Sequence, residues 1–221
     1  HFLRPGLEVI QEFDGLHKFI GWNKVILTDS GGFQGWSIPN RFNDDGIEFK
    51  NIYDGSKFFM DPKLSMDIQQ TLNSDIAMIL DSLIDINKEY DEQLNAINTT
   101  QQWANIARNY HTNNNQSLFG IVQGGKHKEL REKSATDMMT IDFDGYAIGG
   151  LAIGETPEER KEIVNFTVEM LPKDKLRYVM GLGDIEGMLE LIELGVDIFD
   201  CVWPARLARH GKIINKGKFF Y

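Results

Sequence analysis

Carboxylates stand where three short apolar segments of this sequence end. Asp29 closes KVILTD, Asp81 closes DIAMILD, and Asp200 lies near the end of VDIFDCV. A lone aspartate after a strand more often caps a helix than takes part in catalysis. Parallel barrel strands, however, bring their carboxyl ends to one face, where active sites are built. A carboxamide and glycine-rich turns end the other apolar segments, at Gln123, Gly149-Gly150 and Met180-Gly181.

These residue types suit a small, flat, nitrogen-rich ligand such as a purine-like base. Asp81 can accept hydrogen bonds from the N–H donors of an amidine edge, and Gln123 can both donate to and accept from a ring. The backbone N–H groups of Gly149 and Gly150 can approach a ring carbonyl because no Cβ intervenes. Of the two remaining carboxylates, one can serve as nucleophile and one as proton shuttle, as in retaining glycosyl transfer.

Two further features bear on such a ligand and on a polymer that carries it. Phe33 and Met180 can cover the two faces of a ring, and each is equally consistent with core packing. The net charge is −10, yet residues 203–221 contain five Lys or Arg and no Asp or Glu. A local basic patch on an acidic protein can hold phosphates because salt screens the distant charges. The alternative is a solvated basic end without special purpose.

The apolar segments predict the strands that must position these residues. They are continuous rather than alternating, as in strands covered on both faces. Amphipathic patterns separate most of them, and Thr156-Pro157 with Glu159 predicts a helix start with a capping box. Alternating strands and helices predict a parallel sheet with right-handed crossovers. Strands are expected over 24–29, 75–81, 118–124, 145–151, 177–183 and 196–202, and helices over 65–73, 91–111, 126–141, 156–171 and 185–195.

Either a barrel or an open doubly wound sheet accommodates this order. No G-x-G-x-x-G follows the first strand, which lowers the expectation of a dinucleotide site. Six strands are too few for an eight-stranded barrel, so the chain is expected to be a core segment of a longer protein. Residues 35–62 carry short alternating runs and turn signals, which predict a β-hairpin insertion after the first strand. Gln34 and Gly35 are expected to be turn residues.

The composition is that of one globular domain over residues 1–221. Hydrophobic residues make up 42% and charged residues 25%, which is ordinary for such a domain. No apolar run approaches the ~20 residues that span a bilayer, and the first residues given do not have the charged, then apolar, then small-residue pattern of a secretory signal. Cys201 is the single cysteine, so a reducing, cytoplasmic location is expected. The sequence offers no metal-ligand spacing.

Five motifs follow one another along the chain: LTDSGGFQ, FGIVQGG, GYAIGGLAIGE, RYVMGLG and GVDIFDCVWPARLARHG. Together they closely resemble the tRNA-guanine transglycosylases, the queuine/preQ1 tRNA-ribosyltransferases. The resemblance implies an irregular (β/α)8 TIM barrel, of which residues 1–221 would form part of a single catalytic domain. It also implies a pentosyltransferase of queuosine biosynthesis. Such an enzyme exchanges guanine 34 in the tRNA anticodon for a 7-deazaguanine base, preQ1 or queuine.

The resemblance assigns roles to individual residues. Asp200 would be the nucleophile that attacks C1′ of the target ribose, and Asp29 would be the proton acceptor. Arg206 and Arg209 would bind the anticodon loop. The residues implied to bind the base are Asp29, Ser30, Phe33, Asp81, Gln123, Gly149, Gly150, Leu151 and Met180.

The family also implies features outside the chemistry itself. A structural zinc would be held by three cysteines and a histidine beyond residue 221, so no metal ligand is expected in this chain. No ATP or redox cofactor is needed. The partners would be tRNA, the base, and a second subunit in a homodimer or heterodimer.

The identity of the base is left open by departures from the family pattern. The preQ1 enzymes usually follow the base-recognising aspartate with Glu-Cys, whereas Ser82-Leu83 follows Asp81 here, which favours queuine. Ile153 and Glu155 favour preQ1. These two signals conflict.

Three other functions are alternatives to the exchange of guanine 34 in tRNA. One is a non-catalytic RNA-binding partner subunit, but such subunits lose catalytic carboxylates, and Asp29, Asp81 and Asp200 are all present. An archaeal-type or DNA-modifying relative would use the same chemistry on another nucleic-acid site and stays open. A generic barrel hydrolase is the third.

Overall fold

The six apolar segments form one parallel sheet. The computed structural model describes residues 2–38, 40–151, 154–215 and 218–220. Every neighbouring pair of strands in the sheet is parallel, and the order is β1-β5-β6-β7-β8-β9. The strands therefore follow one another around the sheet in chain order, as the sequence predicts. Their bounds are β1 Leu27–Thr28, β5 Ile76–Met78, β6 Ser117–Val122, β7 Gly145–Ile148, β8 Leu176–Val179 and β9 Ile198–Phe199.

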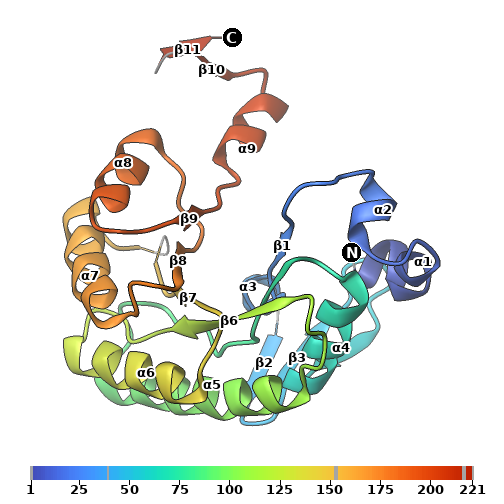
Figure 1. Cartoon of the computed structure of the whole chain (residues 1–221), viewed down its shortest axis with the longest axis horizontal. Coiled ribbons are helices and arrows are strands. Elements are labelled where there is room, and N and C mark those ends of the chain that lie inside the picture. Colours follow the sequence, from blue (N-terminus) through green and yellow to red (C-terminus); the bar gives the residue numbers. More distant parts are fainter. Residues whose placement is uncertain (1, 39, 152–153, 216–217, 221) are drawn as a thin grey trace.

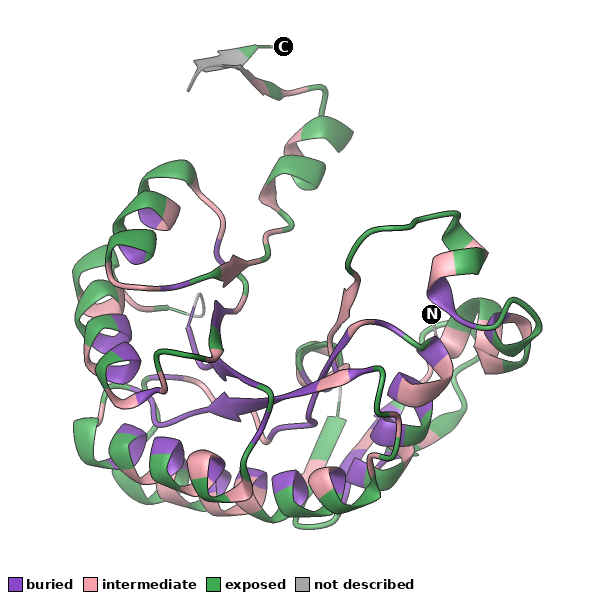
Figure 2. Cartoon of the chain, in the orientation of Figure 1, coloured by how far each residue is buried: buried purple, intermediate pink, exposed green. Residues whose placement is uncertain are grey.

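The predicted helices connect these strands and lie along the outer side of the sheet (Figure 1). Each presents buried residues to the sheet and exposed residues outward (Figure 2). The predicted capping box is confirmed, because Thr156 Oγ1 accepts a hydrogen bond from Glu159 N and Glu159 accepts one from Thr156 N. The bounds are α4 Pro62–Leu72, α5 Tyr90–Tyr110, α6 Lys128–Ile141, α7 Pro157–Met170 and α8 Ile185–Glu193.

The sheet curls into part of a barrel (Figure 1). In the described part of the chain, β1 and β9 form its two edges and do not pair with each other. The expected barrel is thus present as six consecutive parallel strands with helices on the outside. An open doubly wound sheet, with helices on both faces, is excluded by this arrangement.

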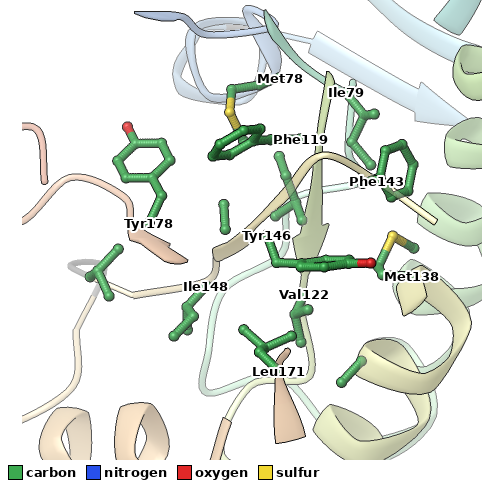
Figure 3. Close-up of a cluster of buried hydrophobic side chains, with 14 of the residues drawn as sticks. Met78, Ile79, Phe119, Val122, Met138, Phe143, Tyr146, Ile148, Leu171 and Tyr178 are labelled. Carbon is green, nitrogen blue, oxygen red and sulfur yellow. The ribbon is translucent and has the colours of Figure 1, made fainter. Parts of the chain in front are cut away.

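Continuous apolar strands pack on both faces because helices cover one side and the barrel interior the other. All residues of β5 and β7 are buried. Figure 3 shows Met78 of β5 beside Phe119 of β6, and these residues are also paired in register. The ring of Tyr178 belongs to the same core, but its hydroxyl points away from the apolar side chains (Figure 3).

The segment after β1 is more elaborate than a single hairpin. Three antiparallel strands, in the order β2-β3-β4, form two hairpins that share β3. The prediction that Gln34 and Gly35 are turn residues is wrong, because both lie in a short helix, α3. Gly31 begins this helix from a left-handed conformation at φ 89°, so the turn is completed before Gln34. The bounds are α3 Gly32–Ser37, β2 Asn40–Asn43, β3 Gly46–Lys50 and β4 Lys57–Met60.

The two ends of the described chain lie outside the parallel sheet. The N-terminal helices pack near the insertion and α4, in the cluster that contains Ile10 and Leu16. After β9, helix α9 and a small hairpin project away from the sheet (Figure 1). In the described residues, no helix has the length and apolar character required to cross a membrane. These terminal elements are η1 Phe2–Gly6, α1 Leu7–Glu12, α2 Leu16–Ile20, α9 Trp203–Arg209, β10 Ile213–Asn215 and β11 Lys218–Phe220.

Candidate active site

The polar residues singled out in the sequence follow the strands on one face of the sheet. Gln123, Gly149, Met180 and Asp200 each come directly after the last residue of a strand. Those last residues pair in register from β6 to β9, so the four positions form a continuous row. Asp29 follows β1 in the same way at the other edge. The carboxyl ends of the strands therefore gather these groups on one face.

Asp200 is held by two hydrogen bonds to one of its carboxylate oxygens. The phenol of Tyr178 and the backbone N–H of Gly181 both donate to Oδ1, each at 2.6 Å. The side chain is exposed, and Oδ2 lies outside these two bonds. A carboxylate anchored through one oxygen and open at the other has the geometry of an oriented nucleophile.

Tyr178 is a hydrogen-bond donor in this arrangement because its hydroxyl stays protonated. The residue is only 2% exposed. Burial, the hydrogen bond to Asp200 and the charges of Asp200 and Asp29 all raise the pKa of the phenol far above its ordinary value. Tyr178 therefore fixes the orientation of Asp200 without exchanging a proton with it.

Asp29 has a raised pKa, as a group that carries a proton through a reaction requires. Burial is the main cause, and the charge of Asp200 adds to it. Hydrogen bonds to the carboxylate oppose the rise, first from Ser30 N, at 2.8 Å to Oδ1, and also from Gln34 and Gly31 N. Because the charge of Asp200 acts on Asp29, the protonation of one carboxyl depends on the charge of the other.

Asp81 and Gln123 form a buried pair behind this face. Asp81 is 7% and Gln123 2% exposed, and Nε2 of Gln123 donates to Oδ2 of Asp81. Burial, followed by the charge of Asp29, raises the pKa of Asp81 to about 7, although the hydrogen bond from Gln123 opposes the rise. Asp29, Asp81 and Asp200 are thus one electrostatically coupled group.

Glycines allow the backbone to pack directly against this pair. A methyl group built on Gly32 would lie 3.1 Å from Oδ1 of Asp81, and one on Gly149 would lie 2.8 Å from Nε2 of Gln123. Gly32 N also donates to Ser30 Oγ at 3.2 Å. The turn after β1 and the turn after β7 therefore meet the same carboxylate–carboxamide pair from two sides.

The remaining residues of the predicted base site differ in accessibility. Phe33 is 48% exposed and its ring centroid lies 5.9 Å from that of Trp36. Met180 is half-buried and packs against the main core. Leu151 is buried in the same core, so only its backbone is placed to meet a ligand. Phe33 and Met180 stand near opposite edges of the sheet, and their covering the two faces of a ring stays a prediction.

The predicted RNA-binding arginines lie on α9, which follows β9. Arg206 and Arg209 are both exposed in the last turn of this helix. Both arginines are close in sequence to Asp200, because α9 begins at Trp203. Ile153, which bears on the identity of the base, lies outside the described residues.

A metal site is not formed by the part of the chain that the structure describes, since it contains no group of three or more His, Cys, Asp or Glu suited to hold an ion. The structural zinc implied by the family resemblance therefore has no ligand set among these residues. No step of the chemistry proposed below involves it.

Two residues of the site were not predicted from the sequence. Tyr178 sits two residues before Met180 within a buried strand, where an aromatic residue is expected for packing alone. Gln34 is predicted to be a turn residue, whereas it lies in α3 and its side chain acts to lower the pKa of Asp29. No sequence pattern distinguishes a buried tyrosine that meets a carboxylate from one that does not, so only the fold identifies Tyr178.

Comparison with known proteins agrees with this arrangement. The family model described as queuine tRNA-ribosyltransferase matches residues 1–219. Proteins named queuine tRNA-ribosyltransferase are 46% identical in Acinetobacter baylyi over 95% of this chain and 49% identical in Thermotoga neapolitana over 98%. The chain spans 56% and 59% of the lengths of these two curated relatives. The chain belongs to the queuine tRNA-ribosyltransferase family.

Proposed function

We propose that this chain is the catalytic core of a tRNA-guanine transglycosylase that exchanges guanine 34 of the anticodon for a 7-deazaguanine base. The observation that carries the proposal is the coupling of three carboxylates on the face where barrel active sites form. Asp200 is oriented by Tyr178 and Gly181, and its charge raises the pKa of Asp29. The family membership gives the reaction type, because relatives carry the name queuine tRNA-ribosyltransferase.

In the first displacement, Oδ2 of Asp200 attacks C1′ of the target ribose and guanine departs. The target nucleotide has to be turned out of its loop to expose C1′. The bond from C1′ to N9 of guanine breaks as the bond from C1′ to Oδ2 forms. Guanine leaves with the bonding electrons, and a proton from Asp29 neutralises it. The product of this step is a ribosyl ester of Asp200.

The second displacement is the first in reverse with a different base. Asp29 takes the proton of the entering base, and the freed electron pair of that base attacks C1′. The ester bond breaks and Asp200 recovers its charge. Because guanine leaving and guanine entering are the same reaction in opposite directions, one residue must serve as acid in one direction and base in the other. Two displacements retain the configuration at C1′.

The coupling between Asp200 and Asp29 assists both steps. Esterification removes the charge of Asp200, which is one of the causes of the raised pKa of Asp29. Asp29 therefore releases its proton more readily as the ester forms and binds one more readily as the ester breaks. The two carboxyls need no external proton store between the half-reactions.

Base recognition is assigned to the buried pair and the glycine turns. Asp81 would accept from the N–H edge of the base, and Gln123 with the Gly149-Gly150 backbone would meet its other edge. Arg206 and Arg209 would contact phosphates of the anticodon loop. The base is preQ1 or queuine, since Glu155 favours the first and Leu83 the second.

The cellular setting follows from the proposed reaction. A tRNA-modifying enzyme would act in the cytoplasm, and Cys201, the one cysteine of residues 1–221, is a free thiol, as a reducing compartment favours. Assembly into a homodimer or heterodimer is expected from the resemblance, and residues 1–221 would then form part of the catalytic domain of one subunit.

The decisive test is incorporation of radiolabelled guanine into unmodified tRNA by the full-length protein. We expect wild-type exchange to be lost by at least about a thousandfold in Asp200→Asn and Asp200→Ala. Asp197→Asn is the matched control. Asp197 directly precedes β9, at the end of the strand opposite Asp200, and its Oδ2 accepts a hydrogen bond from Arg177 N. Unlabelled preQ1 and queuine should compete, and the better competitor identifies the base.

Three outcomes would contradict the assignment. Undiminished exchange in Asp200→Ala would exclude Asp200 as nucleophile. Exchange on DNA but not on tRNA would point to a DNA-modifying relative. Binding of tRNA without any exchange by the wild type would favour a non-catalytic partner subunit.

A further inference from the structure

Arg131 is a buried cation beneath the face on which the base is proposed to bind. It lies on α6 and is only 1% exposed. Its Nε donates to the carbonyl oxygen of Gly125 at 2.8 Å, and its Nη2 donates to that of Gly149 at 3.2 Å. One guanidinium thus bridges the turn after β6 and the turn after β7.

Both turns carry groups assigned to the base. The turn after β6 begins at Gln123 and the turn after β7 contains Gly149 and Gly150. Helix α6 makes a second contact with the turn after β6, because Ser134 Oγ accepts a hydrogen bond from Gln123 N at 3.0 Å. Residues of α6 therefore contact both turns and fix the distance between them.

The packing leaves no room for the turn after β6 to shift toward the arginine, and the turn after β7 packs closely against Gln123. A methyl group on Gly124 would lie 2.7 Å from both Cγ and N of Arg131. One on Gly150 would lie 2.7 Å from Oε1 of Gln123 and 3.7 Å from Nη2 of Arg131. Gly124 and Gly150 also have positive φ angles of 137° and 69°, which other residues rarely adopt. Gly124 thus packs directly on Arg131, and Gly150 packs directly on Gln123.

A guanidinium is suited to this task because its donors diverge in a rigid plane. A lysine has a single nitrogen and cannot hold two carbonyls with the same fixed geometry. Burial lowers the pKa of Arg131 to about 10, and the carboxylate of Glu155 opposes the fall. The side chain therefore remains a cation at neutral pH and keeps both hydrogen bonds.

We propose that Arg131 is a positioning residue for the base: it fixes the turn after Gln123 and the Gly149-Gly150 turn at the spacing that the base requires. This inference rests on the proposed exchange reaction. Asp200 follows β9 and is held by Tyr178 and Gly181, which lie outside the two turns that Arg131 bridges. Loss of Arg131 should thus weaken binding of the base and leave the chemical step nearly intact.

Arg177 provides a matched control at the opposite end of the strands. It is also a buried arginine, 8% exposed, and it also bridges two backbone carbonyls. Its Nη1 donates to Gly195 O at 3.2 Å and its Nη2 to Leu171 O at 3.3 Å. Since Arg177 lies near the start of β8, its removal costs comparable contacts without touching either base-binding turn.

The experiment compares Arg131→Met, Arg131→Lys and Arg177→Met in the full-length protein. With guanine as the varied substrate, we expect the KM for guanine to rise roughly ten- to hundredfold in Arg131→Met. Its kcat and its KM for tRNA should change less than about threefold. Arg131→Lys should fall between wild type and Arg131→Met, and it supplies the measurement should Arg131→Met not fold. Arg177→Met should leave the KM for guanine unchanged.

Hydrogen exchange of backbone amides gives a second readout that needs no activity. Residues 123–127 and 149–151 should exchange faster in Arg131→Met and Arg131→Lys, but not in Arg177→Met. An unchanged KM for guanine in an active Arg131→Met enzyme would overturn the inference. An equal rise of the KM for guanine in Arg131→Met and Arg177→Met would also overturn it.

Failure of the proposed function is distinguishable from failure of this inference. If the wild type exchanges no guanine, the reaction is wrong, and amide exchange alone decides the role of Arg131. Faster exchange in the two turns of the Arg131 variants would then still support positioning of a ligand site. Unchanged exchange there would reject it.

Discussion

Tyr178 donates its phenolic hydrogen to Oδ1 of Asp200 across 2.6 Å, from a ring that is 2% exposed. The two residues belong to neighbouring parallel strands, since Tyr178 pairs in register with Ile198, two residues before Asp200. The core that fixes the tyrosine ring therefore also fixes the carboxylate. Packing of the barrel interior in this way orients Asp200, the proposed nucleophile.

Replacement of this phenol tests the orientation of Asp200. Tyr178→Phe keeps the ring and removes the donor, while Gly181 N still holds the same oxygen. We expect kcat for guanine exchange to fall roughly tenfold, because a hydrogen bond to a charged group contributes about 1.5–3 kcal/mol. The KM for guanine should be little changed. Tyr146→Phe, another buried tyrosine on the adjacent strand, is the control, and an equal effect of both changes would refute a specific role for Tyr178.

Gly32 tests the close approach of α3 to Asp81. In Gly32→Ala the added methyl group would lie 3.1 Å from Oδ1 of Asp81 and 3.4 Å from its backbone oxygen. The carboxylate has to shift, so we expect the KM for the base to rise roughly tenfold. Gly35→Ala on the same helix meets only ordinary contact, 3.4 Å from Cγ2 of Ile47. Steady-state kinetics of both variants should separate them, and matching KM values would argue against this contact.

The raised pKa of Asp81 predicts how stability changes with pH. The folded state favours the protonated carboxyl, with a pKa of about 7 compared with an ordinary value of 3.8. The stabilisation from protonation is complete below pH 3.8 and is lost as the pH rises through 7. Asp81→Asn cannot ionise, so it should gain on the order of 2–4 kcal/mol relative to wild type between pH 4 and pH 8.

Urea unfolding at a series of pH values measures this difference. Glu169→Gln, at an exposed position of α7, is the control, and its free energy of unfolding should change with pH as that of the wild type does. A constant difference between Asp81→Asn and wild type across the range would mean that Asp81 ionises normally in the folded protein.

Salt dependence tests the arginines of α9. Each phosphate contact to single-stranded nucleic acid contributes about −0.7 to the slope of log affinity against log salt. Arg206→Gln and Arg209→Gln should each weaken tRNA binding and reduce the slope by about this amount. Lys63→Gln, at an exposed position on α4, should change neither. Slopes equal to wild type in both arginine variants would place the RNA elsewhere.

Much of the fold follows from patterns that are local in the sequence. Each predicted parallel strand is present, because a run such as DIAMILD has no polar face to leave exposed. Thr156 and Glu159 form the predicted capping box because all of its atoms lie within one helical turn. The alternating runs and turn signals of residues 35–62 predict an insertion after β1. They do not predict its third strand or the helix at Gln34, and that helix forms because Gly31 completes the turn earlier than the pattern suggests.

The site is divided in the same way. The sequence by itself determined which chemical groups end the strands: the carboxylates of Asp29, Asp81 and Asp200 and the carboxamide of Gln123. Parallel strands necessarily bring these ends to one face, so their gathering could be predicted. Only the tertiary structure decided how they act on one another. The contacts of Tyr178 with Asp200, and of Arg131 with Gly125 and Gly149, join side chains to groups on other elements, and such pairings depend on packing that no local pattern encodes.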